Sequence, residues 1–121
     1  MIEIKHKNTG EILLTVDSDT LSGADLSNVD LYGADLSCAI LTGADFRGAD
    51  LTGADLSCAI LTGADFRGAE LTGADFRGAD LTGADLSFST LTRADLTGAL
   101  LSNTNFIDAD LSGADLSYAI L

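Results

Sequence analysis

Carboxylates are the reactive side chains that recur most often in this chain, and they recur at a spacing of five residues. Pairs of aspartates could supply general acid–base catalysis or cation ligands. No pair stands apart from its neighbours, however, and the single histidine, His6, cannot form a repeated Ser–His or Cys–His couple. The pattern therefore predicts a protein that is not an enzyme, with no catalytic residue, metal site or cofactor.

Amino-acid composition and net charge limit the kinds of molecule that this protein could bind. The 121 residues include 19 acidic and 6 basic ones, for a formal net charge of −13 at pH 7, yet 46% are hydrophobic. This is not a disordered acidic tail. The charge excludes binding to nucleic acid by phosphate neutralisation and disfavours anionic membranes. Without a long apolar run or a disulfide framework, we expect neither a membrane span nor a signal peptide, and a cytoplasmic location.

A five-residue repeat runs through residues 21–121. Every fifth residue from Leu21 to Leu121 is Leu or Phe, and the residue two positions earlier is Ala with four exceptions. The residue just before the Leu or Phe is Asp in 13 of the 21 repeats. The unit therefore reads Ala-Asp-Leu-(Ser/Thr)-Gly.

A period of five fits neither a helix nor a flat strand. Successive leucines would be spread around a helix, and they would alternate between the two faces of a strand. The chain must therefore turn once per repeat, with Leu and Ala inside and with Asp, Ser, Thr and Gly in outward or turning positions. We predict a solenoid that stacks like residues on like.

Tandem Ala-(Asp/Asn)-Leu-x-x units over 101 of the 121 residues closely resemble those of the pentapeptide-repeat proteins. The resemblance implies an all-β fold, a right-handed quadrilateral parallel β-helix in which four repeats make one square coil. Leu or Phe at the centre of each repeat would form its core. The predicted structural core includes Leu26, Leu36, Phe46, Leu56, Phe66, Phe76, Leu86, Leu96, Phe106 and Leu116.

The sequence independently supports a coil of 20 residues. Residues 35–54 and 55–74 are identical except that Asp50 is replaced by Glu70. Residues 22–121 would form about five coils, a rod about 24 Å long at about 4.8 Å per stacked strand. Such regularity is expected of an idealised, designed chain and equally of a recent natural duplication.

Sorted by position in the coil, the residues before the core form three mainly acidic columns and one apolar column. Carboxylates about 5 Å apart repel, so we expect full ionisation to cost stability. Either the acidic columns imitate a nucleic-acid backbone or aspartate simply suits the turns through local hydrogen bonds. Arg47 and Arg67 are expected to neutralise the column beside them. The unbroken column, a candidate partner-binding surface, consists of Asp35, Asp55, Asp75, Asp95 and Asp115.

The apolar column is a candidate interface, although its members could also merely pack on one another. Cys38 and Cys58 lie beside it, one coil apart and within disulfide range, but side chains that project in parallel favour free thiols. The candidate interface residues are Ile40, Ile60, Leu100, Tyr118, Ile120 and Leu121.

Residues 1–20 lack the repeat. Apolar and polar residues alternate on both sides of the turn signal Asn8-Thr9-Gly10, which predicts a β-hairpin or strand pair. This N-terminal unit would cap the repeat domain, residues 21–121. No cap follows the last coil, so either a partner covers this end or the chain was cut there. For the first case we expect homodimers through the C-terminal coil.

Two functions fit these observations. The first is a non-enzymatic structural or scaffold protein without a specific ligand site, either natural or engineered. The alternative, implied by the resemblance, is an acidic DNA mimic that binds a DNA-handling protein such as DNA gyrase. Against this alternative, such relatives are generally longer and dimerise through a C-terminal helix that this chain lacks.

Overall fold

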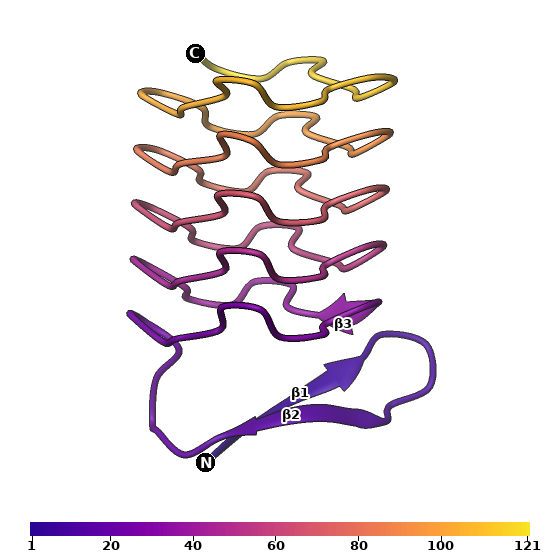
Figure 1. The fold of residues 1–121 in the computed structure, drawn as a ribbon, viewed down its shortest axis with the longest axis vertical. Helices are drawn as coiled ribbons and strands as arrows, with labels where there is room; N and C mark the ends of the chain where they lie inside the picture. The colour runs from indigo at the N-terminus through magenta and orange to yellow at the C-terminus, as the bar shows by residue number, and fades with distance from the viewer.

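Strand pairing joins a hairpin to the first coil of a solenoid in the computed structural model, which describes residues 1–121 (Figure 1). Strands β1 (Ile2–His6) and β2 (Ile12–Val16) pair antiparallel. Strand β1 also pairs antiparallel with β3 (Ala34–Asp35), so the sheet order is β2-β1-β3. The hairpin thus covers the N-terminal end of the solenoid.

A bulge in the hairpin decides which residues face the first coil. Ile4 pairs with Leu14 but Lys5 pairs with Ile12, so Leu13 is an extra residue on β2. A bulge shifts the alternation of side chains on the strand that contains it. Leu13 therefore packs against the core, and Ile12 is 50% exposed. The simple alternation expected over residues 12–16 is wrong at this point.

Hydrogen bonds between successive coils form a parallel ladder with an offset of 20 residues. Parallel bridges join Asp25 to Asp45 and Asp45 to Asp65, and all four columns follow the same rule. The N–H of Leu26 donates to the carbonyl of Asp45 at 2.7 Å, and the N–H of Asp45 donates to the carbonyl of Ala24 at 2.9 Å. The predicted parallel β-helix of about five four-sided coils is confirmed.

Each corner of a coil is a β-turn whose second central residue has a positive φ. At the corner after Leu51, for example, the N–H of Ala54 donates to the carbonyl of Leu51 at 2.9 Å. Positive φ favours glycine, because a Cβ is crowded there. Twelve of the 20 corner positions are glycine. The others are Asn28, Cys38, Cys58, Phe88, Arg93, Asn103, Asp108 and Tyr118, with φ between 56° and 60°.

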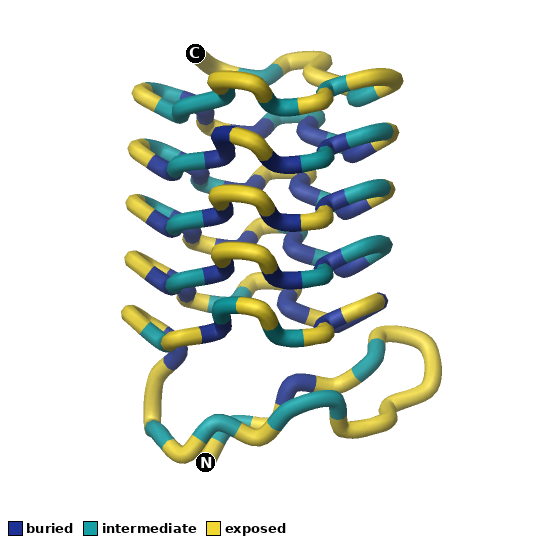
Figure 2. Tube along the Cα trace, viewed as in Figure 1, coloured by how far each residue is buried: buried dark blue, intermediate teal, exposed yellow.

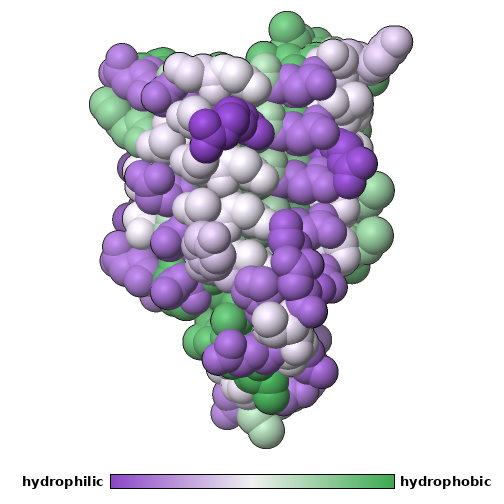
Figure 3. Space-filling view, turned by 90° about the vertical axis from the view of Figure 1, so that its right-hand side faces the viewer, coloured by the Kyte–Doolittle hydropathy of each residue, from purple (hydrophilic) through white to green (hydrophobic).

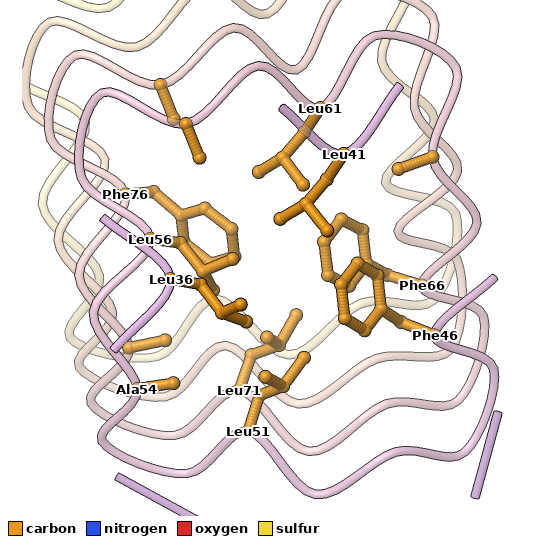
Figure 4. Close-up of a cluster of buried hydrophobic side chains, with 14 of the residues drawn as sticks. Leu36, Leu41, Phe46, Leu51, Ala54, Leu56, Leu61, Phe66, Leu71 and Phe76 are labelled. Carbon is orange, nitrogen blue, oxygen red and sulfur yellow. The ribbon is translucent and has the colours of Figure 1, made fainter. Parts of the chain in front are cut away.

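Leu, Phe and Ala side chains fill the interior, as the buried segments in Figure 2 and the side chains in Figure 4 show. Phe46 and Phe66, one coil apart in the same column, stack with ring centroids 4.8 Å apart and planes 3° from parallel. Phe76 meets Phe66 edge-on from another side at 5.9 Å. The ring separation in the stack gives the rise of one coil.

The predicted core residues occupy two environments. Those from Leu26 to Leu96 are at most 3% exposed. Phe106 is only half-buried, and Leu116 is 40% exposed. Both lie in the coil of residues 102–121, which has a neighbouring coil on one side only. The prediction of a buried core position is therefore wrong for Leu116 and only partly right for Phe106.

Candidate interaction surfaces

No pocket opens on the surface, and core side chains fill the interior. No three His, Cys, Asp or Glu side chains are grouped so that they could hold a metal ion. The structure also has no helix of the length and apolarity needed to cross a membrane. The outward-facing columns of residues are therefore the candidate sites.

Every aspartate that precedes a core Leu or Phe is hydrogen-bonded within its own turn. In all 13 cases, Oδ1 accepts the backbone N–H two residues later at 2.9–3.1 Å. A hydroxyl often adds a second bond, as from Ser57 Oγ to Asp55 Oδ1 at 2.6 Å. Asn105 accepts the N–H of Ile107 in the same way at 3.0 Å. The turn alone thus accounts for an Asp or Asn at these positions.

Local hydrogen bonds also set the ionisation of these carboxyls. In seven of them the pKa is lowered, and the largest cause is a side-chain donor two residues later. Arg47 lowers the pKa of Asp45 to about 2, and Ser27 lowers the pKa of Asp25 although the charge of Asp45 opposes the shift. The other five are Asp65, Asp75, Asp80, Asp110 and Asp115. A lowered pKa means that folding favours the charged form of these seven carboxyls, contrary to the expectation that their ionisation costs stability. At Asp25 and Asp65, the nearby donors outweigh the repulsion from Asp45.

Three arginines partly neutralise two acidic columns. In Arg47, Arg67 and Arg77, Nη2 lies 2.6 Å from Oδ2 of the aspartate two residues earlier. The Nε of each lies 3.8–3.9 Å from the aspartate one coil further on. Their side chains are 50–61% exposed, so these pairs contribute little stability. Sequence reasoning missed Arg77, although its Asp-x-Arg spacing is that of the other two.

The candidate partner-binding column is aligned but not uniform in charge. Parallel bridges connect Asp35 to Asp115 through the three intervening aspartates. The end members are exposed, and Asp55, Asp75 and Asp95 are half-buried. Arg77 contacts both Asp75 and Asp95, so the negative charge is interrupted at mid-column. Figure 3 shows hydrophilic columns of this kind on either side of a central column of intermediate hydropathy.

The candidate apolar interface is exposed but divided. Ile40 and Ile60 are 58% and 42% exposed, and Leu100 is 38% exposed. Asp80 occupies the same column between Ile60 and Leu100, so a carboxylate separates two short apolar patches. The remaining members are also exposed: Ile120 at 58%, Leu121 at 88% and Tyr118 at 89%.

A second apolar pair was not predicted. Phe88 and Ile107 are each 64% exposed. They lie on adjacent coils, since the N–H of Phe88 donates to the carbonyl of Ile107 at 2.9 Å. The signal in the sequence is that Phe88 stands at a corner usually occupied by glycine, and Ile107 stands where most repeats have Ser, Thr or Arg.

The only histidine belongs to the contact between the hairpin and the first coil. His6 lies over Gly33, where an added Cβ would come within 2.3 Å of the histidine Nε2. Its Nδ1 accepts the N–H of Asn8 at 3.1 Å. The N–H of Lys7 donates to the carbonyl of Gly33 at 2.9 Å. His6 therefore has a packing role.

The two cysteines are free and exposed at one corner of successive coils. The backbone N–H of Cys38 donates to the carbonyl of Ser57 at 2.8 Å, a hydrogen bond that joins this corner to the next coil. These observations agree with the expectation of free thiols.

Comparison with solved structures finds the same repeat. A pentapeptide repeat protein from the thylakoid lumen of Arabidopsis thaliana is 40% identical over 84% of this chain and 68% of its own, with a TM-score of 0.48. HetL from Nostoc sp. strain PCC 7120, involved in the regulation of heterocyst differentiation, is 32% identical over 83% of this chain, with a TM-score of 0.54. This chain spans only 58% of HetL.

Trypsin-treated QnrB1, a plasmid-mediated fluoroquinolone resistance protein, is 25% identical over 86% of this chain and 68% of its own, with a TM-score of 0.43. No curated protein matches the sequence. The profile of pentapeptide repeats matches residues 20–57, 49–87, 59–98 and 89–121, with 8 copies. These matches extend over the whole solenoid, and the chain belongs to the pentapeptide repeat family.

Proposed function

We propose that this chain is a non-enzymatic structural or scaffold protein without a specific ligand site. The observation that carries the proposal is that all 13 repeat aspartates accept a hydrogen bond within their own turn. Their carboxylates are therefore accounted for by the fold, and no pocket gathers them around a substrate. A cytoplasmic location fits the two free cysteines.

Linear charge density supports the alternative, an acidic mimic of DNA that binds a DNA-handling protein such as gyrase. Three acidic columns with a coil rise of 4.8 Å place one carboxylate per about 1.6 Å of the axis, against about 1.7 Å per phosphate in duplex DNA. The arginine pairs reduce this density, with Arg77 acting within the candidate partner-binding column. For that reason the scaffold remains the first proposal.

A gyrase supercoiling assay separates the two functions. A scaffold leaves both supercoiling and quinolone-induced cleavage unchanged at micromolar protein. A mimic inhibits or protects gyrase, and the effect weakens when Asp35, Asp55, Asp75, Asp95 and Asp115 are replaced by asparagine. Asparagine is the matched substitution because it removes charge but keeps the turn acceptor, as Asn105 does. Inhibition or protection by the wild type that the asparagine variant loses would overturn the scaffold proposal.

We also propose that the chain forms a homodimer through its C-terminal coil. Leu116 is 40% exposed and Leu121 is 88% exposed, so pairing would remove apolar surface from water. Light scattering at high protein concentration should report a dimer that Leu116→Asp dissociates. A wild-type monomer under these conditions would contradict the proposal.

A further inference from the structure

We propose that Cys38 and Cys58 form a two-coordinate dithiolate site for a soft monovalent ion, Cu(I). Both thiols are free and exposed. They occupy the same corner of successive coils, two residues before Ile40 and Ile60, which are joined by a parallel bridge. These are the only cysteines in the chain. The site is independent of the function proposed above.

Repeat geometry determines how close the two side chains are. Phe46 and Phe66 are also 20 residues apart, and their rings lie 4.8 Å apart and nearly parallel. Equivalent atoms of these two coils are therefore separated by about one coil rise. Cys38 and Cys58 share a φ of 58° and have the same neighbours in sequence. Their Cα atoms, and likewise their Cβ atoms, are thus about one coil rise apart.

The thiol of Cys58 points along the stack. Its Sγ lies 3.5 Å from the position that a Cβ on Gly78, one coil further on, would occupy. Because the step from Cys38 to Cys58 repeats the step from Cys58 to Gly78, a Cys38 side chain in the same orientation brings its Sγ to the same distance from the Cβ of Cys58. Rotation about the Cα–Cβ bond of Cys58 then lets both sulfurs face a single ion.

The spacing suits a bridging ion better than a disulfide. A disulfide needs Cβ atoms about 3.5–4.5 Å apart and sulfurs about 2.05 Å apart, so the two parallel side chains would have to bend toward each other. Two metal–thiolate bonds on opposite sides of an ion, taken at the Zn–S length of about 2.3 Å, separate the sulfurs by about 4.6 Å. That separation is close to the 4.8 Å rise of one coil.

The surrounding residues select the kind of ion. No third His, Cys, Asp or Glu joins the two thiols, which excludes the four-ligand site that structural Zn²⁺ requires. Soft thiolates favour Cu(I), which two sulfurs can hold. On binding, each thiol loses its proton and forms one S–Cu bond, and copper stays Cu(I). The net charge of −13 favours the approach of a cation.

An anaerobic titration tests the site. Reduced protein is mixed with Cu(I) held as its coloured bicinchoninate complex, and the loss of colour reports transfer. The wild type should withdraw one Cu(I) per chain. Cys38→Gly and Cys58→Gly should each withdraw none. Both variants should fold, because glycine is the usual residue at corners with positive φ, as at Gly78 and Gly98.

Moving the pair provides the matched control. Cys38→Gly combined with Gly78→Cys places thiols on adjacent coils at 58 and 78, and it should again withdraw one Cu(I). Cys58→Gly combined with Gly78→Cys keeps two thiols but sets them two coils apart, and it should withdraw none. The new Cβ at residue 78 would contact only the Sγ of Cys58, at 3.5 Å.

Three outcomes would overturn the site. The first is a reduced wild type that withdraws no Cu(I). The second is a failure of the control variants: the folded variant with thiols at 58 and 78 binds no Cu(I), or the variant with thiols at 38 and 78 binds it as well as the wild type. The third is one Cu(I) per two chains with dimerisation by light scattering, because the ion would then join two molecules.

Discussion

Replacing Asp35, Asp55, Asp75, Asp95 and Asp115 together by asparagine should leave the solenoid folded, whereas replacing them by alanine should remove much of its stability. In each case Oδ1 accepts the backbone N–H two residues later at 2.9–3.1 Å. Asparagine keeps that acceptor, as Asn105 shows with its 3.0 Å bond to the N–H of Ile107. Alanine leaves the turn N–H without its partner.

The expected magnitudes follow from these bonds. A hydrogen bond of this type contributes about 1 kcal/mol, so five alanine substitutions should cost about 5 kcal/mol. That loss is comparable with the whole free energy of unfolding of a marginal domain, about 5–15 kcal/mol. The asparagine variant loses the charge assistance, which matters most at Asp75 and Asp115, whose pKa values are lowered by hydrogen bonds. We expect a smaller loss for that variant than for the alanine variant, because it keeps an acceptor, although a neutral acceptor bonds more weakly than a charged one.

Urea denaturation followed by far-UV circular dichroism at pH 7 measures both variants against the wild type. Equal slopes of the unfolding free energy against urea would show that the same surface is exposed in all three proteins. If the asparagine and alanine variants lost the same stability, charge rather than the turn acceptor would explain the aspartates. If neither lost stability, the turn bonds would contribute nothing.

Other perturbations test the hairpin, the core and the pH dependence. In urea denaturation, Gly33→Ala should lower the free energy of unfolding by about 1 kcal/mol more than Gly53→Ala does. Gly53 stands at the same corner one coil further on, where an added Cβ meets no neighbouring atom. His6→Ala should abolish the difference, because it removes the side chain that crowds residue 33. Leu61→Ala, at a fully buried position, should cost about 2–5 kcal/mol and lower Tm in a thermal scan; a loss below 1 kcal/mol would contradict the packed core. The pKa of Asp45 falls from 3.8 to about 2 in the folded chain, so its contribution to stability is present above pH 4 and is lost as pH falls from about 4 to 2. Tm measured as a function of pH should therefore decrease as the pH falls over this range. An increase in Tm would instead show that repulsion between the carboxylates dominates.

Most of the fold could be predicted from the sequence because the five-residue spacing of Leu or Phe is local and unbroken. Leu26 and Leu56 are buried as predicted, since a chain that buries one residue in five has to turn at every repeat. The hairpin was only partly predictable. The extra residue Leu13 depends on how β1 and β2 align, which alternation alone does not encode.

The candidate surfaces were less predictable, because they depend on contacts between coils. Asp-x-Arg at 75–77 is visible in the sequence, but the approach of Arg77 to Asp95 requires the stacking of two coils. Leu116 has the same repeat position as Leu96, yet it is 40% exposed because only one coil covers it. Repeats of the same sequence pattern thus differ in burial and in ion pairing, because the coils next to them differ.

By itself, the sequence determined the period, the inward-facing residues and the columns into which charge and apolar groups fall. Those properties follow from the side-chain preferences of five consecutive residues. Only the tertiary structure decided that the aspartates are bound within their own turns, that Arg77 approaches Asp95 one coil further on, and that the thiol of Cys58 points along the stack. These features depend on backbone torsions and on the 4.8 Å rise between coils, and no single repeat contains that distance.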